Sequence, residues 1–181
     1  MPDADQDYFL ALSEDPTLRR VLRKLGLTEV RVFRMRHNAG IWISKPEWLI
    51  PSPPVYGQSV WIHFEARRPG ECRLEIDTHP YVPGLGQKPD QLAELATAVQ
   101  LKSLLLRRLR ECIMAEPRLQ ELGASTAALR DPEQPDAGTA VKFISGLPAD
   151  ASPAESAGFI ATVVEQVAPL VDQCLPRGAE G

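Results

Sequence analysis

Apolar and polar residues alternate through Ser59–His79, and this period of two predicts a β-hairpin with one buried face. The positions that share the apolar face are Val60, Ile62, Phe64, Ala66, Cys72, Leu74 and Ile76. A one-residue slip would turn a whole strand over, so both apolar sets must lie on the same side of the sheet. The rest of the chain is expected to cover that side.

Two registers keep the apolar sets together, and charge pairing decides between them. A three-residue loop at 68–70 places Gly70 in a left-handed conformation and sets opposite charges across the two strands. The cross-strand pairs in this register are Arg67–Glu71, Glu65–Arg73 and His63–Glu75. The alternative register places like charges opposite each other and is disfavoured. Its pairs would be Glu65–Glu75 and Arg67–Arg73.

Further elements are expected on both sides of this hairpin. Asp15–Pro16 is typical of a helix start, and Ser152–Glu155 forms a capping box before an amphipathic C-terminal run. The other predicted elements are helices at 8–12 and 16–25, strands at 29–36 and 41–43, a long helix at 89–116, a hairpin of 125–130 with 139–145, and a C-terminal helix after Ser152. This order predicts an α+β fold. An antiparallel sheet of two to three hairpins packs against an N-terminal helix, a long middle helix and a C-terminal helix.

The chain has enough apolar material for one core, because 44% of its 181 residues are hydrophobic. A single domain over 1–181 is expected, with disordered tails at 1–7 and 176–181. A proline-stiffened loop, Lys45–Gln58, carries Trp48 and Tyr56. We expect this loop to pack over a sheet edge and its aromatics to plug the core, and contact with a ligand is the alternative.

Charge and cysteine content narrow the class of protein. A net charge of −4 gives no reason to expect nucleic acid as the main partner. Three widely spaced cysteines disfavour a disulfide framework or a zinc site. The N-terminus lacks the pattern of a secretion signal, and no window approaches the roughly 20 apolar residues of a membrane span. We therefore expect a cytoplasmic protein with no cofactor and no membrane contact.

The polar side of the central hairpin is the candidate functional site. It gathers His63, Glu65, Glu75, Asp77 and His79, residue types that ligate metals or transfer protons. No ligand motif of defined spacing is present, and arginines lie among the carboxylates, so we interpret the side as a solvated charge ladder. Binding residues are assigned to this side and to the proline-rich loop. They are Trp48, Tyr56, Trp61, His63, Glu65, Arg73, Glu75 and Asp77.

The long helix predicted at 89–116 carries more apolar surface than a single seam would bury. The surplus comes from a second stripe of Leu101, Leu105 and Cys112 beside the main one. Either the sheet and another helix together cover it, or a homodimer forms through this helix.

The element order, and the closing run VKFISGLPADASPAESAGFIATVVEQVAPLVDQCL, resemble the type III secretion chaperone-like fold and its YbjN-type relatives. The resemblance implies a small acidic cytoplasmic protein that dimerises and binds segments of partner proteins. This chain differs from the pattern by an extra strand pair, by the 45–58 loop and by a longer middle helix.

The residues and the resemblance together predict a non-enzymatic protein-binding domain that acts as a chaperone, adaptor or inhibitor-like factor. Two other functions are kept as hypotheses. One is a metal-dependent hydrolase that uses the His/Glu/Asp patch of the hairpin. The other is a nucleic-acid-binding protein that uses Arg19, Arg20, Arg23, Arg107, Arg108 and Arg110 on one contiguous surface.

Overall fold

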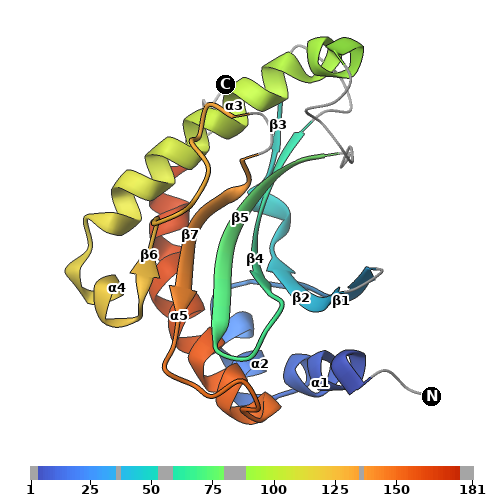
Figure 1. Ribbon diagram of the computed structural model, residues 1–181, viewed down its shortest axis with the longest axis vertical. Coiled ribbons are helices and arrows are strands. Elements are labelled where there is room, and N and C mark those ends of the chain that lie inside the picture. Colours follow the sequence, from blue (N-terminus) through green and yellow to red (C-terminus); the bar gives the residue numbers. More distant parts are fainter. Residues whose placement is uncertain (1–3, 36–37, 53–58, 80–88, 135–136, 176–181) are drawn as a thin grey trace.

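The computed structural model has an α+β architecture in which α-helices pack against a seven-stranded antiparallel sheet (Figure 1). It describes residues 4–35, 38–52, 59–79, 89–134 and 137–175. The helices are α1 (Ala4–Ser13), α2 (Pro16–Lys24), η1 (Pro46–Trp48, a 3-10 helix), α3 (Pro89–Met114), α4 (Pro117–Glu121) and α5 (Pro153–Cys174). The strands are β1 (Glu29–Met35), β2 (Asn38–Ser44), β3 (Leu49–Pro51), β4 (Ser59–Ala66), β5 (Glu71–His79), β6 (Ala124–Ser125) and β7 (Thr139–Ile144). The predicted fold class is confirmed.

The sheet has the strand order β1-β2-β4-β5-β7-β6, and β3 pairs with β4 beyond the end of β2. Helices α1, α2 and α5 lie behind the sheet in Figure 1, and α3 crosses its upper end. The apolar side of every long strand faces these helices, so one cluster of buried side chains joins sheet and helices. The predicted burial of Val60, Ile62 and Phe64 is confirmed.

The central hairpin is β4 and β5, and its predicted register is confirmed. Glu65 faces Arg73 and His63 faces Glu75 across the two strands, and Gly70 has a φ of 68°. The predicted rung between Arg67 and Glu71 is wrong, because the ladder ends at Glu65. The turn diverts those two side chains to other partners, as described below.

Both predicted helix caps form. The Asp15 side chain accepts hydrogen bonds from the backbone N–H of Thr17 and Leu18 at the start of α2. The Ser152 hydroxyl accepts from the backbone N–H of Glu155, whose carboxylate accepts from the Ser152 backbone N–H. These interactions fix where the two helices begin.

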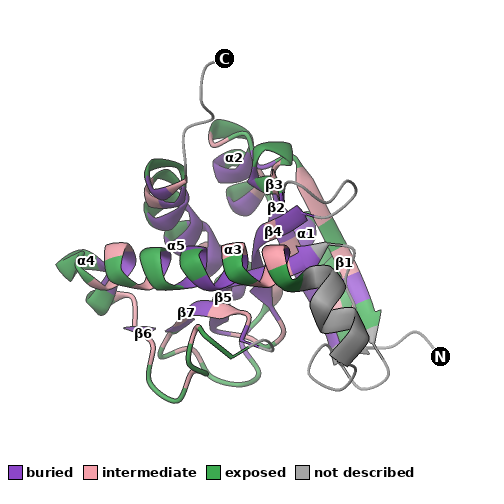
Figure 2. Cartoon of the chain, turned by 90° about the horizontal axis from the view of Figure 1, so that it is seen from above, coloured by how far each residue is buried: buried purple, intermediate pink, exposed green. Residues whose placement is uncertain are grey.

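Helix α3 buries one side and exposes the other along the part of it whose side chains are described (Figure 2). Leu105, Leu106, Leu109 and Ile113 are fully or almost fully buried where α3 meets α5 and the sheet. Leu104, with 58% of its surface exposed, is the only large apolar side chain so exposed among those described on α3. Most of the expected apolar surplus is thus covered within the chain.

Four sequence-based expectations need correction. The N-terminal helix α1 starts at Ala4, so part of the expected tail 1–7 is ordered as helix. The expected strand at 125–130 reduces to the two residues of β6. The expected loop at 45–58 contains η1 and β3. Trp48 does not lie over a sheet edge but packs on Phe64 in the interior, with ring centroids 5.7 Å apart, so the expectation that this loop plugs the core is confirmed for Trp48. The predicted tail 176–181 lies outside the described residues.

Candidate functional site

The side of the sheet that faces away from α1, α2 and α5 carries most of the residues predicted to form a site. We call it the polar face, and its members are Trp42, Trp61, His63, Glu65, Arg73, Glu75 and Asp77. The strand alternation that buries Ile62 and Phe64 on the other side directs these residues here. The hairpin register then places His63 beside Glu75 and Trp61 beside Asp77.

Aromatic rings line the part of the polar face nearest β1. Phe33 stacks on Trp42 at 4.3 Å between ring centroids, and Trp61 stacks on His63 at 4.0 Å. Trp42 contacts Trp61 edge to face at 5.5 Å, so the four rings form one continuous row. Trp42 was not among the predicted site residues. The alternation of Ile41 and Ile43 around it was the signal that could have placed it on this face.

The polar face is buried, and the interpretation as a solvated charge ladder is therefore wrong. His63 has no exposed surface, Glu65 has 3% exposed and Glu75 has 9%. The neighbouring tryptophan rings cover His63, and the β7 strand with its preceding loop covers Glu75. Alternation predicts which side a residue faces but does not reveal how large neighbours shield it.

Several of the charges are paired within the face. The Glu65 carboxylate accepts a hydrogen bond from Trp42 Nε1 at 2.7 Å and pairs with Arg67. Arg73 pairs with Glu71 at 2.7 Å, and Lys142 of β7 also reaches Glu71 at 2.9 Å. These are the partners that replace the predicted Arg67–Glu71 rung.

His63 is the least satisfied polar residue of the face. Neither ring nitrogen has a hydrogen-bond partner within the described part of the chain, and its Nε2 lies 3.9 Å from Asp77 Oδ2. Burial lowers the pKa of His63 to about 3; the Trp61 backbone opposes this shift and the Arg67 charge adds to it. The imidazole is therefore neutral at neutral pH.

The two carboxylates beside His63 shift in the opposite direction. Burial, together with the Glu65 and Asp77 charges, raises the pKa of Glu75 to about 8, although the Thr139 hydrogen bond and the Arg73 charge oppose the rise. Burial likewise raises the pKa of Asp77 to about 6, although Lys102 of α3 lowers it. Perturbed titrating groups of this kind gather at functional sites more often than elsewhere.

The remaining predicted residues lie elsewhere. Trp48 is on the opposite side of the sheet, where its Nε1 donates to Asp172 Oδ1 at 2.8 Å. Tyr56 and the side chain of His79 lie outside the described residues. Among the residues described, no three His, Cys, Asp or Glu side chains are arranged to hold a metal ion. The polar face therefore brings together Trp61, His63, Glu65, Arg73, Glu75 and Asp77 but not Trp48.

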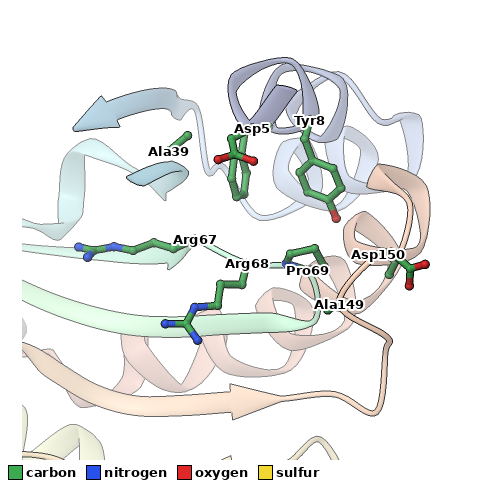
Figure 3. A pocket seen from close by; sticks show the side chains of 10 residues that line it. Asp5, Tyr8, Ala39, Arg67, Arg68, Pro69, Ala149 and Asp150 are labelled. Carbon is green, nitrogen blue, oxygen red and sulfur yellow. The ribbon is translucent and has the colours of Figure 1, made fainter. Parts of the chain in front are cut away.

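A cavity of about 360 Å³ lies at the opposite end of the hairpin from α3 (Figure 3). It is bounded by α1, the start of β2, the β4–β5 turn and the loop before α5. Tyr8 points from α1 toward Pro69, while the Arg67 and Arg68 side chains extend away along the sheet (Figure 3). The Tyr8 hydroxyl is already engaged, donating to Ser156 Oγ at 2.6 Å. Sequence reasoning did not anticipate this cavity, because four distant segments form it.

The arginines considered for nucleic-acid binding are divided between two helices. Three lie on α2 and three on the second half of α3, two helices at different places in the fold (Figure 1). Arg19 pairs with Glu14 and Arg107 with Glu133. Arg110 donates to backbone carbonyls of β7 and of the loop before it. Arg23 Nε also donates to the Arg19 carbonyl at 3.3 Å, so four of the six arginines are engaged with other described residues of the chain.

Comparisons with protein-family models, with curated proteins and with solved structures give no match to this chain. The resemblance to the type III secretion chaperone-like fold stays a prediction. Within the described residues, no helix is both long and apolar enough to cross a membrane. All three cysteines are free thiols.

Proposed function

We propose that this protein binds an extended segment of another protein, which adds to the sheet as a further strand beside β1. The observation that carries the proposal is the difference between the two edges of the sheet. One edge is closed by groups from the chain itself, whereas the other pairs on one side only within the described residues.

The closed edge is the outer side of β7. Strand β6 pairs with Phe143 and Lys142, and it covers only that end of β7. Beyond β6, the Arg110 guanidinium takes over: its Nε donates to the Ala140 carbonyl at 3.1 Å, and its Nη2 donates to the Thr139 carbonyl at 2.8 Å. A charged side chain that hydrogen-bonds to the backbone carbonyls of an edge strand prevents another strand from pairing with them.

The open edge is β1. This strand is seven residues long, and among the described residues it pairs with β2 alone. Val30 and Val32 are partly buried against the core, so a strand added beside them would extend an apolar surface that already exists. Each backbone hydrogen bond gained would contribute about 0.5–1.5 kcal/mol, enough in sum for a specific complex.

Charge selects among partner segments. Arg31 is exposed on β1 and has no ion pair or hydrogen bond with any described residue. A partner segment with an acidic residue opposite Arg31 would gain a cross-strand pair of about 0.2–1 kcal/mol. The proposed partner is therefore an extended segment with apolar residues alternating with at least one Asp or Glu.

A displayed library of random linear peptides, selected on the full-length protein, tests the proposal without knowledge of the natural partner. Amide hydrogen exchange is then measured with and without a selected peptide. We expect new protection in β1 and selected sequences that carry acidic residues. Protection confined to other elements, or failure to select any peptide, would contradict strand addition at β1.

A matched pair of charge reversals sharpens this test. Arg31→Glu on β1 is expected to weaken a selected peptide at least threefold. Arg118→Glu on α4 makes the same charge change at an exposed site beside the closed edge and is expected to leave binding unchanged. Equal weakening by both variants would indicate a general charge effect in place of contact at β1.

We also propose that two copies of the chain form a homodimer through α3. What supports it is the exposed Leu104, on the side of the helix away from the core. Leu104→Glu would then reduce the molar mass measured by sedimentation from dimer to monomer. A wild-type protein that sediments as a monomer at about 100 μM would count against this dimer.

A further inference from the structure

The polar face holds more hydrogen-bond acceptors than donors to serve them. Glu65 Oε2 accepts hydrogen bonds from Trp42 and Arg67, and the carboxylate forms an ion pair with Arg67. Glu75 receives the Thr139 hydroxyl at 2.8 Å, but Arg73 comes no closer to it than 4.0 Å. For Asp77, the nearest recorded polar contact among described residues is His63 Nε2, at 3.9 Å, which is too long for a hydrogen bond. Among the described residues, the Asp77 carboxylate therefore has no hydrogen-bond donor, and Glu75 Oε2 has none either.

His63 makes the shortage more severe. Its side chain is fully buried, both ring nitrogens are without a partner in the described structure, and Nε2 is directed toward Asp77. A buried polar group left unpaired costs about 1–3 kcal/mol. Native proteins keep such groups when something outside the chain satisfies them or when they serve a function.

The cations already present do not remove the deficit. Arg67 is committed to Glu65, and Arg73 and Lys142 are committed to Glu71. Lys102 of α3 acts on Asp77 and lowers its pKa. The pKa of Asp77 nevertheless remains raised to about 6 and that of Glu75 to about 8, so the site still favours added positive charge.

The aromatic residues decide which cation fits. Trp61 lies directly across from Asp77 in the hairpin register, and both Trp61 and Trp42 are partly exposed. The Asp77 side chain keeps 34% of its surface exposed and is open to a ligand. Gly138 packs closely on the two carboxylates, since a methyl group there would lie only 3.2 Å from Glu75 Oε2 and 3.4 Å from Asp77 Oδ1, so a ligand must approach from the exposed side of Asp77. A planar guanidinium can stack on an indole ring while donating to two oxygens, which a spherical ammonium group cannot do.

We propose that the polar face binds the guanidinium group of an arginine side chain on a partner protein, held between Trp61 and the carboxylates of Asp77 and Glu75. The group donates to Asp77 and, as Glu75 releases its proton to solvent on binding of the cation, to the second oxygen of Glu75, while its plane lies against the indole. This site deepens the proposed function, because the arginine belongs to the bound protein. It is nevertheless tested without any peptide.

Nα-acetyl-L-arginine amide is the probe, and the side-chain indole N–H signals in two-dimensional nitrogen–proton NMR spectra are the readout. We expect the Trp61 signal to shift in a saturable manner. The Trp48 indole, on the other side of the sheet and bonded to Asp172, serves as an internal control and should not move. Nα-acetyl-L-lysine amide should produce a response at least threefold weaker.

Asp77→Asn tests the carboxylate, and Asp150→Asn, an exposed acidic residue near the distant cavity, is the matched control. We expect the first variant to weaken the arginine probe at least fivefold and the second to leave it unchanged. Glu75→Gln, which keeps the shape of the side chain, provides a second carboxylate variant if Asp77→Asn does not fold. No saturable shift in the wild type, or equal binding of the lysine probe, would overturn the proposal.

Acid pH should weaken the same complex. With Asp77 protonated below its pKa, the affinity for the arginine probe should fall about three- to tenfold between pH 7.5 and 5.0. In Asp77→Asn the remaining dependence should be smaller. An affinity that is constant over this range would contradict a role for Asp77.

Failure of this site and failure of strand addition are distinguishable. Arg31→Glu should weaken selected peptides without changing the response to the arginine probe. If peptides protect another part of the chain, the arginine site still stands or falls on the indole shifts alone.

Discussion

Glu75 occupies a place in the sheet that favours the protonated acid. In the unfolded chain it ionises near its usual pKa of 4.5, whereas in the folded protein burial holds the proton until about pH 8. Because the pKa of Glu75 is higher in the folded protein, its contribution to the free energy of unfolding is fully present below pH 4.5 and is lost as the pH rises through 8. Glu75 therefore reduces the stability of the folded protein at alkaline pH.

Glu75→Gln should remove this loss. The amide is isosteric and uncharged, so we expect the free energy of unfolding at pH 8 to rise by about 2 kcal/mol relative to the wild type. Urea denaturation at pH 6 and pH 8 measures it. The control Glu111→Gln, exposed on α3, should change neither value. A Glu75→Gln protein with the wild-type difference between the two pH values would contradict the assignment.

His63 affects the stability of the protein at acid pH. The unfolded chain protonates it below pH 6.5, but the folded protein resists protonation until about pH 3, so its contribution to stability falls as the pH drops from 6.5 to 3. His63→Phe keeps a ring for stacking on Trp61 and removes the two unpartnered nitrogens. We expect unfolding to cost about 1 kcal/mol more at pH 7 and a larger gain at pH 5. Denaturation curves in which the gain does not grow toward acid pH would argue against this.

For single residues, the sequence predicted which side of the sheet a side chain faces but not whether neighbouring side chains bury it. Alternation and charge pairing were sufficient to set His63 against Glu75 and to place Gly70 in the turn. They did not reveal that Trp42, from a different hairpin, would complete the row of rings. Burial of a polar side chain depends on neighbours that become adjacent only after the strands have been ordered.

Among the elements, the long runs were predictable and the short ones were not. The helices that start at Asp15 and Ser152 have side-chain caps written into their sequences, and the central strands have a clear period of two. Strand β3 has three residues beside a proline and β6 has two, too few for a period to show. Both exist because a longer neighbour, β4 or β7, presents a free edge to them.

Arg110 is the residue that links α3 to the edge of β7. Arg110→Met retains most of the aliphatic stem but leaves the Thr139, Ala140 and Arg130 carbonyls without this donor. We expect the free energy of unfolding to fall by about 1–3 kcal/mol. The control Arg108→Met, an exposed position on the same helix, should have little effect. Urea denaturation compares the two, and equal effects would show that the bonds to β7 are not responsible.

For the whole molecule, the opposing shifts of His63 and the carboxylates predict an unusual pH profile. Between pH 6 and 8, Glu75 and Asp77, whose pKa values are raised, lower the free energy of unfolding as the pH rises. His63 contributes little over most of that range, because it is close to neutral in both the folded and the unfolded protein. The wild-type protein should therefore melt roughly 4–8 °C higher at pH 6 than at pH 8. Calorimetry at matched ionic strength measures this. A higher melting temperature at pH 8 would mean that other groups dominate the profile.

The two edges of the sheet also limit how many molecules can join. A sheet with both edges free can recruit copies end to end without limit, which is the route to filaments. Here Arg110 and β6 obstruct the β7 edge, so the strand addition we propose would be confined to β1. Self-association by the proposed route, with β1 of one copy paired to β1 of another, would use both open edges and would end at a pair.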